Sequence, residues 1–289
     1  MKICKDTRFL IVGLGLLGGS YAKALKKQGF SVQAVTRSRS SIDYALEQGI
    51  IDGGAAFPDP DLIGNADFVV LAMYPQTMLD WVQANQHLFQ SGALITDVTG
   101  VKSCVVEPMQ TMLRSDVEFI AAHPMAGRET LGVQNADDSI FRGANYIVTP
   151  TDKNTPEAIA ACEELGRLLG FARISRLTPE KHDEMIGFVS QLTHAIAVAL
   201  MTCNDIDGLE KYTGDSFRDL TRIAKINDEM WSELFLANRE ALLEQMDQFA
   251  AQFAVMRQQL AAGDREGMRA VMRHSTLRRK ALEKQDERK

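Results

Sequence analysis

Short apolar runs alternate with helix-period segments over the first 150 residues of the chain. Consecutive apolar positions predict buried β-strands at 9–12, 32–35, 67–72, 93–97, 118–122 and 145–149. Apolar residues spaced three and four apart predict helices between these runs, at 21–28, 41–48, 76–89 and 102–113. Gly29 is placed to end the first helix. The alternation predicts the α/β class, a Rossmann-like doubly wound parallel sheet covered by helices.

The pattern changes after Pro150, where a helix over 155–169 leads to a short strand at 171–174 and strand signals then cease. The rest of the chain has helix-period segments at 180–203, 217–225, 229–261 and 264–285. We therefore predict two domains, a nucleotide-binding Rossmann-like domain over 1–176 and an all-helical substrate and dimerisation domain over 177–289. The apolar stripes of these helices need a partner, and we expect a homodimer.

Composition narrows the class of protein. Of 289 residues, 45% are hydrophobic and 24% are charged, which excludes a disordered or collagen-like chain. We judge the apolar stretches too short for a membrane helix, which needs roughly 18 residues, and we find no cleavable leader, so we expect a cytoplasmic protein without a membrane partner. A net charge of −6 argues against nucleic acid as a partner. Four widely separated cysteines suggest neither a metal site nor a disulfide framework.

A glycine-rich hexapeptide follows the first predicted strand and opens the first predicted helix. It reads Gly13-Leu14-Gly15-Leu16-Leu17-Gly18. In a dinucleotide site the first glycine makes the tight turn, the second admits a pyrophosphate to the backbone, and the third allows helix and strand to pack closely. The helix N-terminus adds unpaired N–H groups and a partial positive charge. The sequence therefore predicts dinucleotide binding, with a purely structural glycine turn as the alternative.

The end of the second strand indicates which dinucleotide binds. NAD sites usually carry an acidic residue about 20 residues after the glycines, where it binds the ribose 2′-hydroxyl. The corresponding segment here contains no carboxylate and reads Thr36-Arg37-Ser38-Arg39. Two guanidinium groups beside hydroxyls suit a 2′-phosphate. We predict NADP as the preferred cofactor, with NAD possible; the alternative is a solvated basic loop.

Residues that directly follow the strands of a parallel sheet face its ligand crevice. Met73 follows the run at 67–72, and we expect it beside the cofactor. His123 follows the run at 118–122. A histidine there can accept a hydroxyl proton at neutral pH because its ordinary pKa is about 6.5. The alternative is a structural hydrogen-bonding role.

Five segments in order carry a resemblance: GLGLLGGS, TDVTGVK, AAHPMAGRE, HDEMIGFVSQLTHAIA and FRDLTRIAKIND. Together they resemble the prephenate dehydrogenase family, which includes arogenate and cyclohexadienyl dehydrogenases of tyrosine biosynthesis. The resemblance implies oxidative decarboxylation of prephenate to 4-hydroxyphenylpyruvate with NAD(P)⁺, without a metal, in a dimer. The alternatives are arogenate as the substrate and a non-catalytic NADPH sensor.

The resemblance also implies roles for individual residues. His123 matches the catalytic base, His194 a second histidine of the substrate pocket, and Arg222 the arginine that binds a substrate carboxylate. Glu129 and Asp219 match acidic residues near the pocket mouth. Considered without the family, His194 is a core or surface residue, and Arg222 pairs with Asp219 on a helix surface.

The chain departs from the family where many relatives have a serine that orients the histidine. Gly100 stands there, and we expect Thr99 or a water molecule to supply the hydroxyl instead. His182 matches a recurring family position, to which we assign only a structural role.

Overall fold

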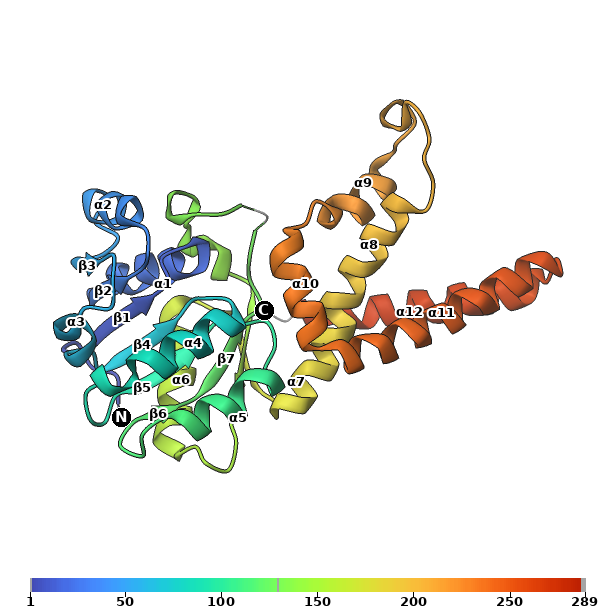
Figure 1. Cartoon of the computed structure of the whole chain (residues 1–289). Helices are drawn as coiled ribbons and strands as arrows, with labels where there is room; N and C mark the ends of the chain where they lie inside the picture. Colours follow the sequence, from blue (N-terminus) through green and yellow to red (C-terminus); the bar gives the residue numbers. More distant parts are fainter. Residues whose placement is uncertain (1, 129, 287–289) are drawn as a thin grey trace. The chain divides into compact units, whose positions relative to one another are not determined.

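A computed structural model of the chain describes residues 2–128 and 130–286. The chain divides into two compact units, residues 1–239 and residues 240–289 (Figure 1). The boundary expected between residues 176 and 177 lies inside the first unit, where strands give way to helices, and it stays a prediction.

The first unit is built on a six-stranded parallel sheet with the order β3-β2-β1-β4-β5-β6, which confirms the Rossmann-like class. The strands are β1 (Arg8–Val12), β2 (Ser31–Val35), β3 (Gly53–Ala55), β4 (Phe68–Leu71), β5 (Leu94–Asp97) and β6 (Glu118–Phe119). In β1, Phe9 and Ile11 belong to one apolar cluster and Leu10 and Val12 to another. Because side chains alternate between the faces of a strand, both faces of the sheet are buried.

Helices cover both faces of this sheet. They are α1 (Leu16–Lys27), α2 (Arg39–Glu47), α3 (Pro60–Gly64), α4 (Pro75–Asn85), α5 (Ser103–Met112) and α6 (Pro156–Leu169), with short 3₁₀ turns η1 (Gln86–Leu88), η2 (Val133–Asn135) and η3 (Asp138–Phe141). Gly29 follows α1 with a φ of 84°, as its predicted role in ending that helix requires. The sequence patterns missed β3 and α3, which are short.

A second, three-stranded sheet contains β7 (Ala121–Pro124), β8 (Asn145–Thr149) and β9 (Arg173–Arg176). β7 runs antiparallel to β8 and pairs His123 with Ile147, whereas β8 and β9 are parallel. The single strand expected at 118–122 was therefore wrong, because the chain leaves the first sheet after Ile120, whose N–H still donates to the carbonyl of Ile95. This change of sheet places His123.

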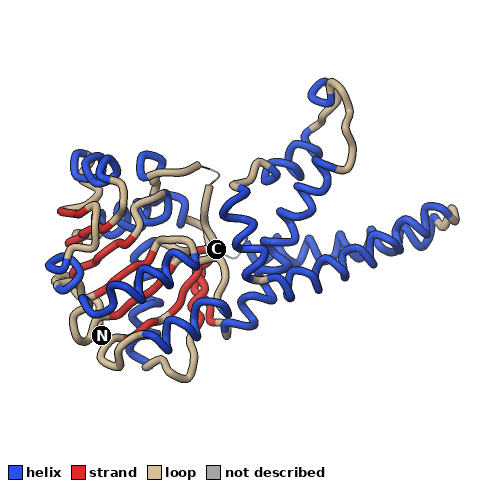
Figure 2. The backbone as a smooth tube through the Cα atoms, in the orientation of Figure 1, coloured by secondary structure: helices blue, strands red, loops and turns tan. Residues whose placement is uncertain are grey.

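Helices make up the rest of the first unit, and among the described residues β9 is the last strand (Figure 2). They are α7 (Pro179–Ile186), the π-helical turn η4 (Gly187–Gln191), α8 (Leu192–Thr202), η5 (Leu209–Lys211), α9 (Asp215–Thr221), η6 (Arg222–Ala224) and α10 (Asp228–Ala237). The single helix expected over 229–261 was wrong, because it breaks at Asn238. The Asn238 amide donates to the carbonyl oxygen of Asp183 (2.9 Å) and to Oε1 of Gln191 (2.7 Å).

The stretch Pro179–Thr202 is long and apolar enough to cross a membrane by length and composition. The expectation that the chain has no such stretch was therefore wrong. The stretch spans α7, η4 and α8, and its buried polar side chains bond to other parts of residues 1–239, as Gln191 does to the carbonyl oxygen of Leu234 (2.9 Å). A core helix passes the same test of length and composition, so a single stretch of this kind is weak evidence for a membrane span.

The second unit contains α11 (Arg239–Ala261), apart from its first residue, and α12 (Arg265–Asp286). Gly263, with a φ of 64°, lies in the turn between them, and the Asp264 carboxylate accepts the N–H of Gly267 (2.9 Å) at the start of α12. Both helices carry exposed apolar side chains: Leu243, Met246, Phe249, Phe253, Leu260, Met272 and Leu277. Such a surface is typical of a protein–protein contact.

Candidate active site

The glycine loop at the carboxyl end of β1 has the geometry that a dinucleotide needs. Gly13 has a φ of 94°, and a β-carbon there would lie 2.3 Å from the carbonyl oxygen of Ala72. A β-carbon on Gly18 would lie 2.0 Å from the carbonyl oxygen of Gly13, so helix and strand are in close backbone contact. On Gly15 the same position has no atom within 4 Å apart from those of its neighbours in the chain. That open space is where a pyrophosphate can approach the backbone.

The N-terminus of α1 is free of competing groups. Gly15 is its N-cap, no side chain caps the helix, and its first turn contains no acidic residue. The N–H groups and the partial positive charge can therefore serve an anion. Leu14 is buried in the core, Leu16 and Leu17 are half-buried, and Met73 borders the loop, since its Cγ would lie 2.9 Å from a β-carbon on Gly13. These residues fit a dinucleotide.

The loop after β2 presents two exposed guanidinium groups, on Arg37 and Arg39. Ser38 caps α2 by accepting the N–H of Ser41 (3.2 Å), and the N–H of Thr36 donates to the carbonyl oxygen of Ala55 (3.1 Å). Arg39 Nε donates to the carboxylate of Asp43 (2.8 Å), one turn into the helix. Hydrogen bonds of Thr36 and Ser38 thus hold the loop in place. Its two arginines give it a positive charge at the end of β2.

His123 is hydrogen-bonded to His182, a residue 59 positions later in the chain on α7. Their Nδ1 and Nε2 atoms lie 2.8 Å apart, and His182 Nδ1 lies 2.8 Å from a carboxylate oxygen of Asp183. His182 is fully buried, whereas His123 is half-buried. The three side chains form a chain of hydrogen bonds that begins in the interior and ends at His123.

The Asp183 carboxylate is ionised and fixed. It accepts the backbone N–H groups of Lys102 (2.8 Å) and Ser103 (2.7 Å) at the N-terminus of α5. Burial raises its pKa, but hydrogen bonds from His182 and Ser103 together lower the pKa below its ordinary value. An ionised carboxylate only accepts hydrogen bonds. His182 therefore carries its proton on Nδ1, and its Nε2 accepts the proton on His123 Nδ1.

This pattern leaves a lone pair on His123 Nε2. Burial, the neighbouring His182 and the Lys102 charge, in that order, hold the pKa of His123 well below 6.5. The imidazole is therefore neutral at neutral pH. Its Nε2 lies 3.8 Å from the position of a β-carbon on Gly100, where Leu234 of α10 also approaches to 3.7 Å. His123 can accept a proton from a hydroxyl bound beside this loop.

Behind His123 lies a buried ion pair between Asp97 and Lys102, whose side chains are both fully buried at 2.6 Å. Thr99 is a buried residue, 4% exposed, and its hydroxyl is bonded inside this network, to the Asp97 carboxylate, the carbonyl oxygen of Val101 (2.9 Å) and Lys102 Nζ (3.1 Å). The hydroxyl that we expected to replace the missing serine is thus bonded to Asp97, Val101 and Lys102, and the catalytic role of Thr99 stays a prediction.

Helix α10 connects the surroundings of His123 with those of His194. The Trp231 and His194 rings stack with centroids 3.8 Å apart, and Leu234, one turn along α10, lies beside Gly100. Glu233 of the same helix accepts the N–H of Gln76 at the start of α4 (3.0 Å). His194 Nδ1 lies 2.9 Å from the carbonyl oxygen of Ser190. Side chains of α10 therefore lie beside His194 and beside Gly100, the residue that His123 Nε2 approaches.

The remaining candidates lie on the same helical segment or outside the described residues. Arg222 opens η6, is exposed, and belongs to a turn that packs against α8, the helix of His194. Asp219 is exposed on α9. Glu129 lies outside the described residues.

Sequence reasoning missed Asp183 and undervalued His182. The signal was present, since a histidine and an aspartate stand side by side at the start of a predicted helix. The sequence pattern could not show that His182 pairs with His123, because His123 lies on a strand 59 positions earlier in the chain.

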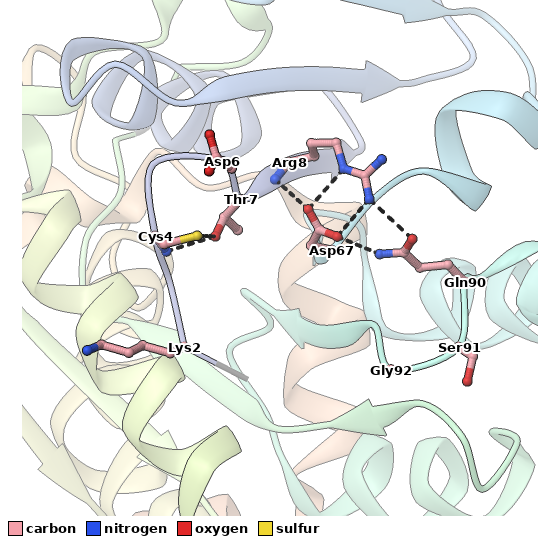
Figure 3. Close-up of a pocket in the computed structure, with 9 residues that line it drawn as sticks. All are labelled: Lys2, Cys4, Asp6, Thr7, Arg8, Asp67, Gln90, Ser91 and Gly92. Atoms are coloured by element: carbon pink, nitrogen blue, oxygen red, sulfur yellow. Dashed lines mark hydrogen bonds and ion pairs between the residues drawn. The ribbon is translucent and has the colours of Figure 1, made fainter.

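A hollow of about 490 Å³ lies at the opposite, amino edge of the sheet (Figure 3). Arg8 and Asp67 form an ion pair there (2.8 Å), and Gln90 donates to the same carboxylate (2.7 Å). The Arg8 hydrogen bond lowers the pKa of Asp67 to about 2. These groups satisfy one another and connect β1 with β4. We assign this hollow no part in the chemistry.

Within residues 2–128 and 130–286, no group of three or more histidine, cysteine or acidic side chains could hold a metal ion. Burial raises the pKa of the Cys162 thiol to about 12, so it is not a nucleophile.

Two family models match the chain. One is described as the nucleotide-binding domain of prephenate dehydrogenase and matches residues 21–174. The other is described as the dimerization domain of prephenate dehydrogenase and matches residues 178–274.

Individual relatives agree with these matches. Prephenate dehydrogenase of Bacillus subtilis is 30% identical over 277 residues, covering 93% of this chain and 74% of the relative. The structure of A. aeolicus prephenate dehydrogenase in complex with hydroxyphenyl propionate and NAD⁺ is 29% identical, with a TM-score of 0.89, over 97% of this chain and 100% of that one. Synechocystis arogenate dehydrogenase is 25% identical, with a TM-score of 0.83, over 96% of this chain and all of that one.

Proposed function

The chain belongs to the prephenate dehydrogenase family, a family of NAD(P)-dependent oxidoreductases, and we propose that it oxidatively decarboxylates prephenate to 4-hydroxyphenylpyruvate with NADP⁺. One observation carries the proposal. The chain of hydrogen bonds from Asp183 through His182 leaves a basic Nε2 on His123, at the sheet edge that also carries the glycine loop.

His123 acts as the general base. Its Nε2 accepts the proton of the C4 hydroxyl, while its Nδ1 keeps its hydrogen bond to His182, whose own Nδ1 donates to the Asp183 carboxylate. When bound, the nicotinamide ring accepts the hydride from C4. The ring carboxylate leaves as CO₂, its bonding electrons complete the aromatic ring, and the phenol oxygen recovers the proton from His123.

Arg222 and His194 bind the substrate in this proposal. A guanidinium binds a carboxylate through two parallel hydrogen bonds, and prephenate carries two carboxylates. Support comes from the packing of η6 against α8 and from the stack of Trp231 on His194, which hold both residues on one helical segment. Leu234 adds an apolar side chain beside Gly100, on the side of the loop that His123 Nε2 approaches.

NADP is the preferred cofactor in this proposal. The exposed guanidinium groups of Arg37 and Arg39 follow β2, where a 2′-phosphate would lie, and no acidic residue occurs among Thr36–Arg39. The Asp43 carboxylate holds Arg39 by Nε, which leaves the terminal nitrogens of its guanidinium for an anion. The structure of the A. aeolicus relative is a complex with NAD⁺, and the kinetic assay below therefore compares both cofactors.

A homodimer, in the cytoplasm, completes the proposal. The dimerization-domain match and the exposed apolar side chains of α11 and α12 support self-association.

The reaction is tested by following NAD(P)H absorbance with prephenate and arogenate, each combined with NAD⁺ and NADP⁺. We expect the highest kcat/KM with prephenate and NADP⁺, and no turnover by His123→Asn. A higher kcat/KM with arogenate would assign the alternative substrate, which carries an amino group in place of the keto oxygen. No turnover with either substrate would refute the proposal.

A further inference from the structure

Lys102 is a fully buried cation that the reaction itself does not use. Its ammonium donates to Asp97 Oδ2 (2.6 Å), to the carbonyl oxygen of Ala122 (2.7 Å), and to the carbonyl oxygen (3.0 Å) and hydroxyl (3.1 Å) of Thr99. Removing two charges from water is expensive and is repaid only by good geometry and further hydrogen bonds. The Asp97–Lys102 pair meets both requirements, so its position is rigidly fixed.

The ion pair holds the residue that precedes His123. The N–H of Ala122 donates to Asp97 Oδ1 (3.1 Å), and its carbonyl oxygen accepts from Lys102. At this point β7 has left the parallel sheet, so backbone pairing with β5 no longer fixes it. The two side chains replace that pairing. They thereby set where His123 stands relative to the loop 97–102.

Lys102 also holds the other end of the hydrogen-bonded chain. Its backbone N–H donates to Asp183 Oδ1, the same oxygen that accepts from His182 Nδ1. One residue therefore contacts both the strand of His123 and the carboxylate that orients His182. A shift of Lys102 would change the distance between the two imidazoles.

We propose that Lys102, together with Asp97, is the positioning element of the active site: its side chain fixes the backbone before His123, and its N–H fixes Asp183. This inference rests on the proposed function for its kinetic consequences only. The Lys102 charge also affects the two imidazoles directly. It lowers the pKa values of both His123 and His182, although burial is the larger cause. A neutral pair in its place would let the pKa of His123 rise.

The test uses the full-length double variant Asp97→Asn/Lys102→Met, which removes both charges and so leaves no unpaired buried ion. Arg8→Met/Asp67→Asn is the matched control, an ion pair at the other edge of the same sheet. We expect kcat with prephenate to fall by at least about tenfold and KM for NADP⁺ to change by less than about threefold. We expect the control variant to keep the kcat and the KM for NADP⁺ of the unchanged protein.

A second readout needs no substrate. In ¹⁵N-histidine NMR, with the His123 resonance assigned through His123→Asn, we expect the double variant to raise the pKa of His123 and the control to leave it unchanged. The acid limb of the pH dependence of kcat/KM should move to higher pH in parallel. An unchanged pKa of His123 together with an unchanged kcat would overturn the proposal. If prephenate fails as a substrate, the NMR result still decides the role of Lys102.

Thr99→Val covers the case in which the double variant does not fold. It removes the hydroxyl that contacts both Asp97 and Lys102 while keeping both charges. We expect kcat to fall severalfold, and Thr99→Ser to restore it, because serine keeps the hydroxyl. A Thr99→Val enzyme with kcat and His123 titration like those of the unchanged protein would count against the proposal in the same way.

Discussion

His123 Nδ1 lies 2.8 Å from His182 Nε2, and this single hydrogen bond decides which nitrogen of His123 is basic. A histidine that donates from Nδ1 keeps its lone pair on Nε2. The direction of donation is set one step further, by the ionised Asp183. Asp183 thus orients both imidazoles from inside the protein, where it also accepts the N–H of Lys102 at the end of the loop that contains Gly100.

Replacing His123 by Asn should abolish turnover and leave cofactor binding intact. The variant removes the base but no contact of the glycine loop. We expect kcat to fall by up to about 10⁴-fold, which leaves no turnover that the assay detects. Steady-state kinetics measure the loss of turnover, and a fluorescence titration with NADPH measures cofactor binding. A variant that retains normal kcat would remove His123 from the mechanism.

Replacing His182 by Asn should reduce kcat by about 10–100-fold with little change in KM, because the base stays in place but loses the group that fixes its tautomer. The matched control is His87→Asn, which changes a histidine on η1, away from this hydrogen-bonded chain. Steady-state kinetics of both variants test this prediction. Equal kcat values in the two variants would show that the tautomer does not matter.

The free energy of unfolding should fall as pH falls below about 6.5. The folded-state pKa values of His123 and His182 are both lowered, so the unfolded chain binds more protons between the folded and unfolded pKa values. Stability therefore rises with pH through that window and is lost as acid protonates these groups. Urea unfolding at several pH values measures how steeply the free energy of unfolding changes with pH. The variant His123→Asn should show a shallower dependence. A slope that is identical in the variant would contradict the assignment.

Arg37→Ala and Arg39→Ala should each raise KM for NADP⁺ about tenfold and leave KM for NAD⁺ within about twofold, because only NADP⁺ carries the 2′-phosphate. Arg173→Ala, at an exposed position on β9, is the control. Kinetics with both cofactors give the answer. Equal losses for NAD⁺ and NADP⁺ would show that these guanidinium groups do not read the phosphate.

Side chains of different size at position 100 test whether the substrate binds in the space beside Gly100. A β-carbon there meets only ordinary contacts, at 3.7 Å from Leu234 and 3.8 Å from His123 Nε2. Gly100→Ser should therefore fold with a Tm close to that of the unchanged protein and keep most of its activity. Gly100→Val fills the space in front of the imidazole and should lower kcat/KM about 100-fold. If valine is tolerated as well as serine, the substrate hydroxyl does not bind there.

The sequence by itself determined the features that depend on local pattern. The alternating runs predicted the parallel sheet, and the position of the glycines between a strand and a helix predicted the turn that the structure contains at Gly13. Both follow from residue spacing and backbone geometry, which act over a few neighbours. The position of His123 directly after an apolar run likewise identified it as a candidate base without any knowledge of its partners.

Only the tertiary structure decided where His123 lies and which residues orient its imidazole. The strand break at Ile120, the helix break at Asn238 and the inward turn of the Thr99 hydroxyl all depend on hydrogen bonds to residues elsewhere in the chain or to buried neighbours. Asp183 meets Lys102 across 81 positions, and His182 meets His123 across 59. Periodicity carries no record of such contacts, because their energy comes from burying polar groups that must then find partners in three dimensions.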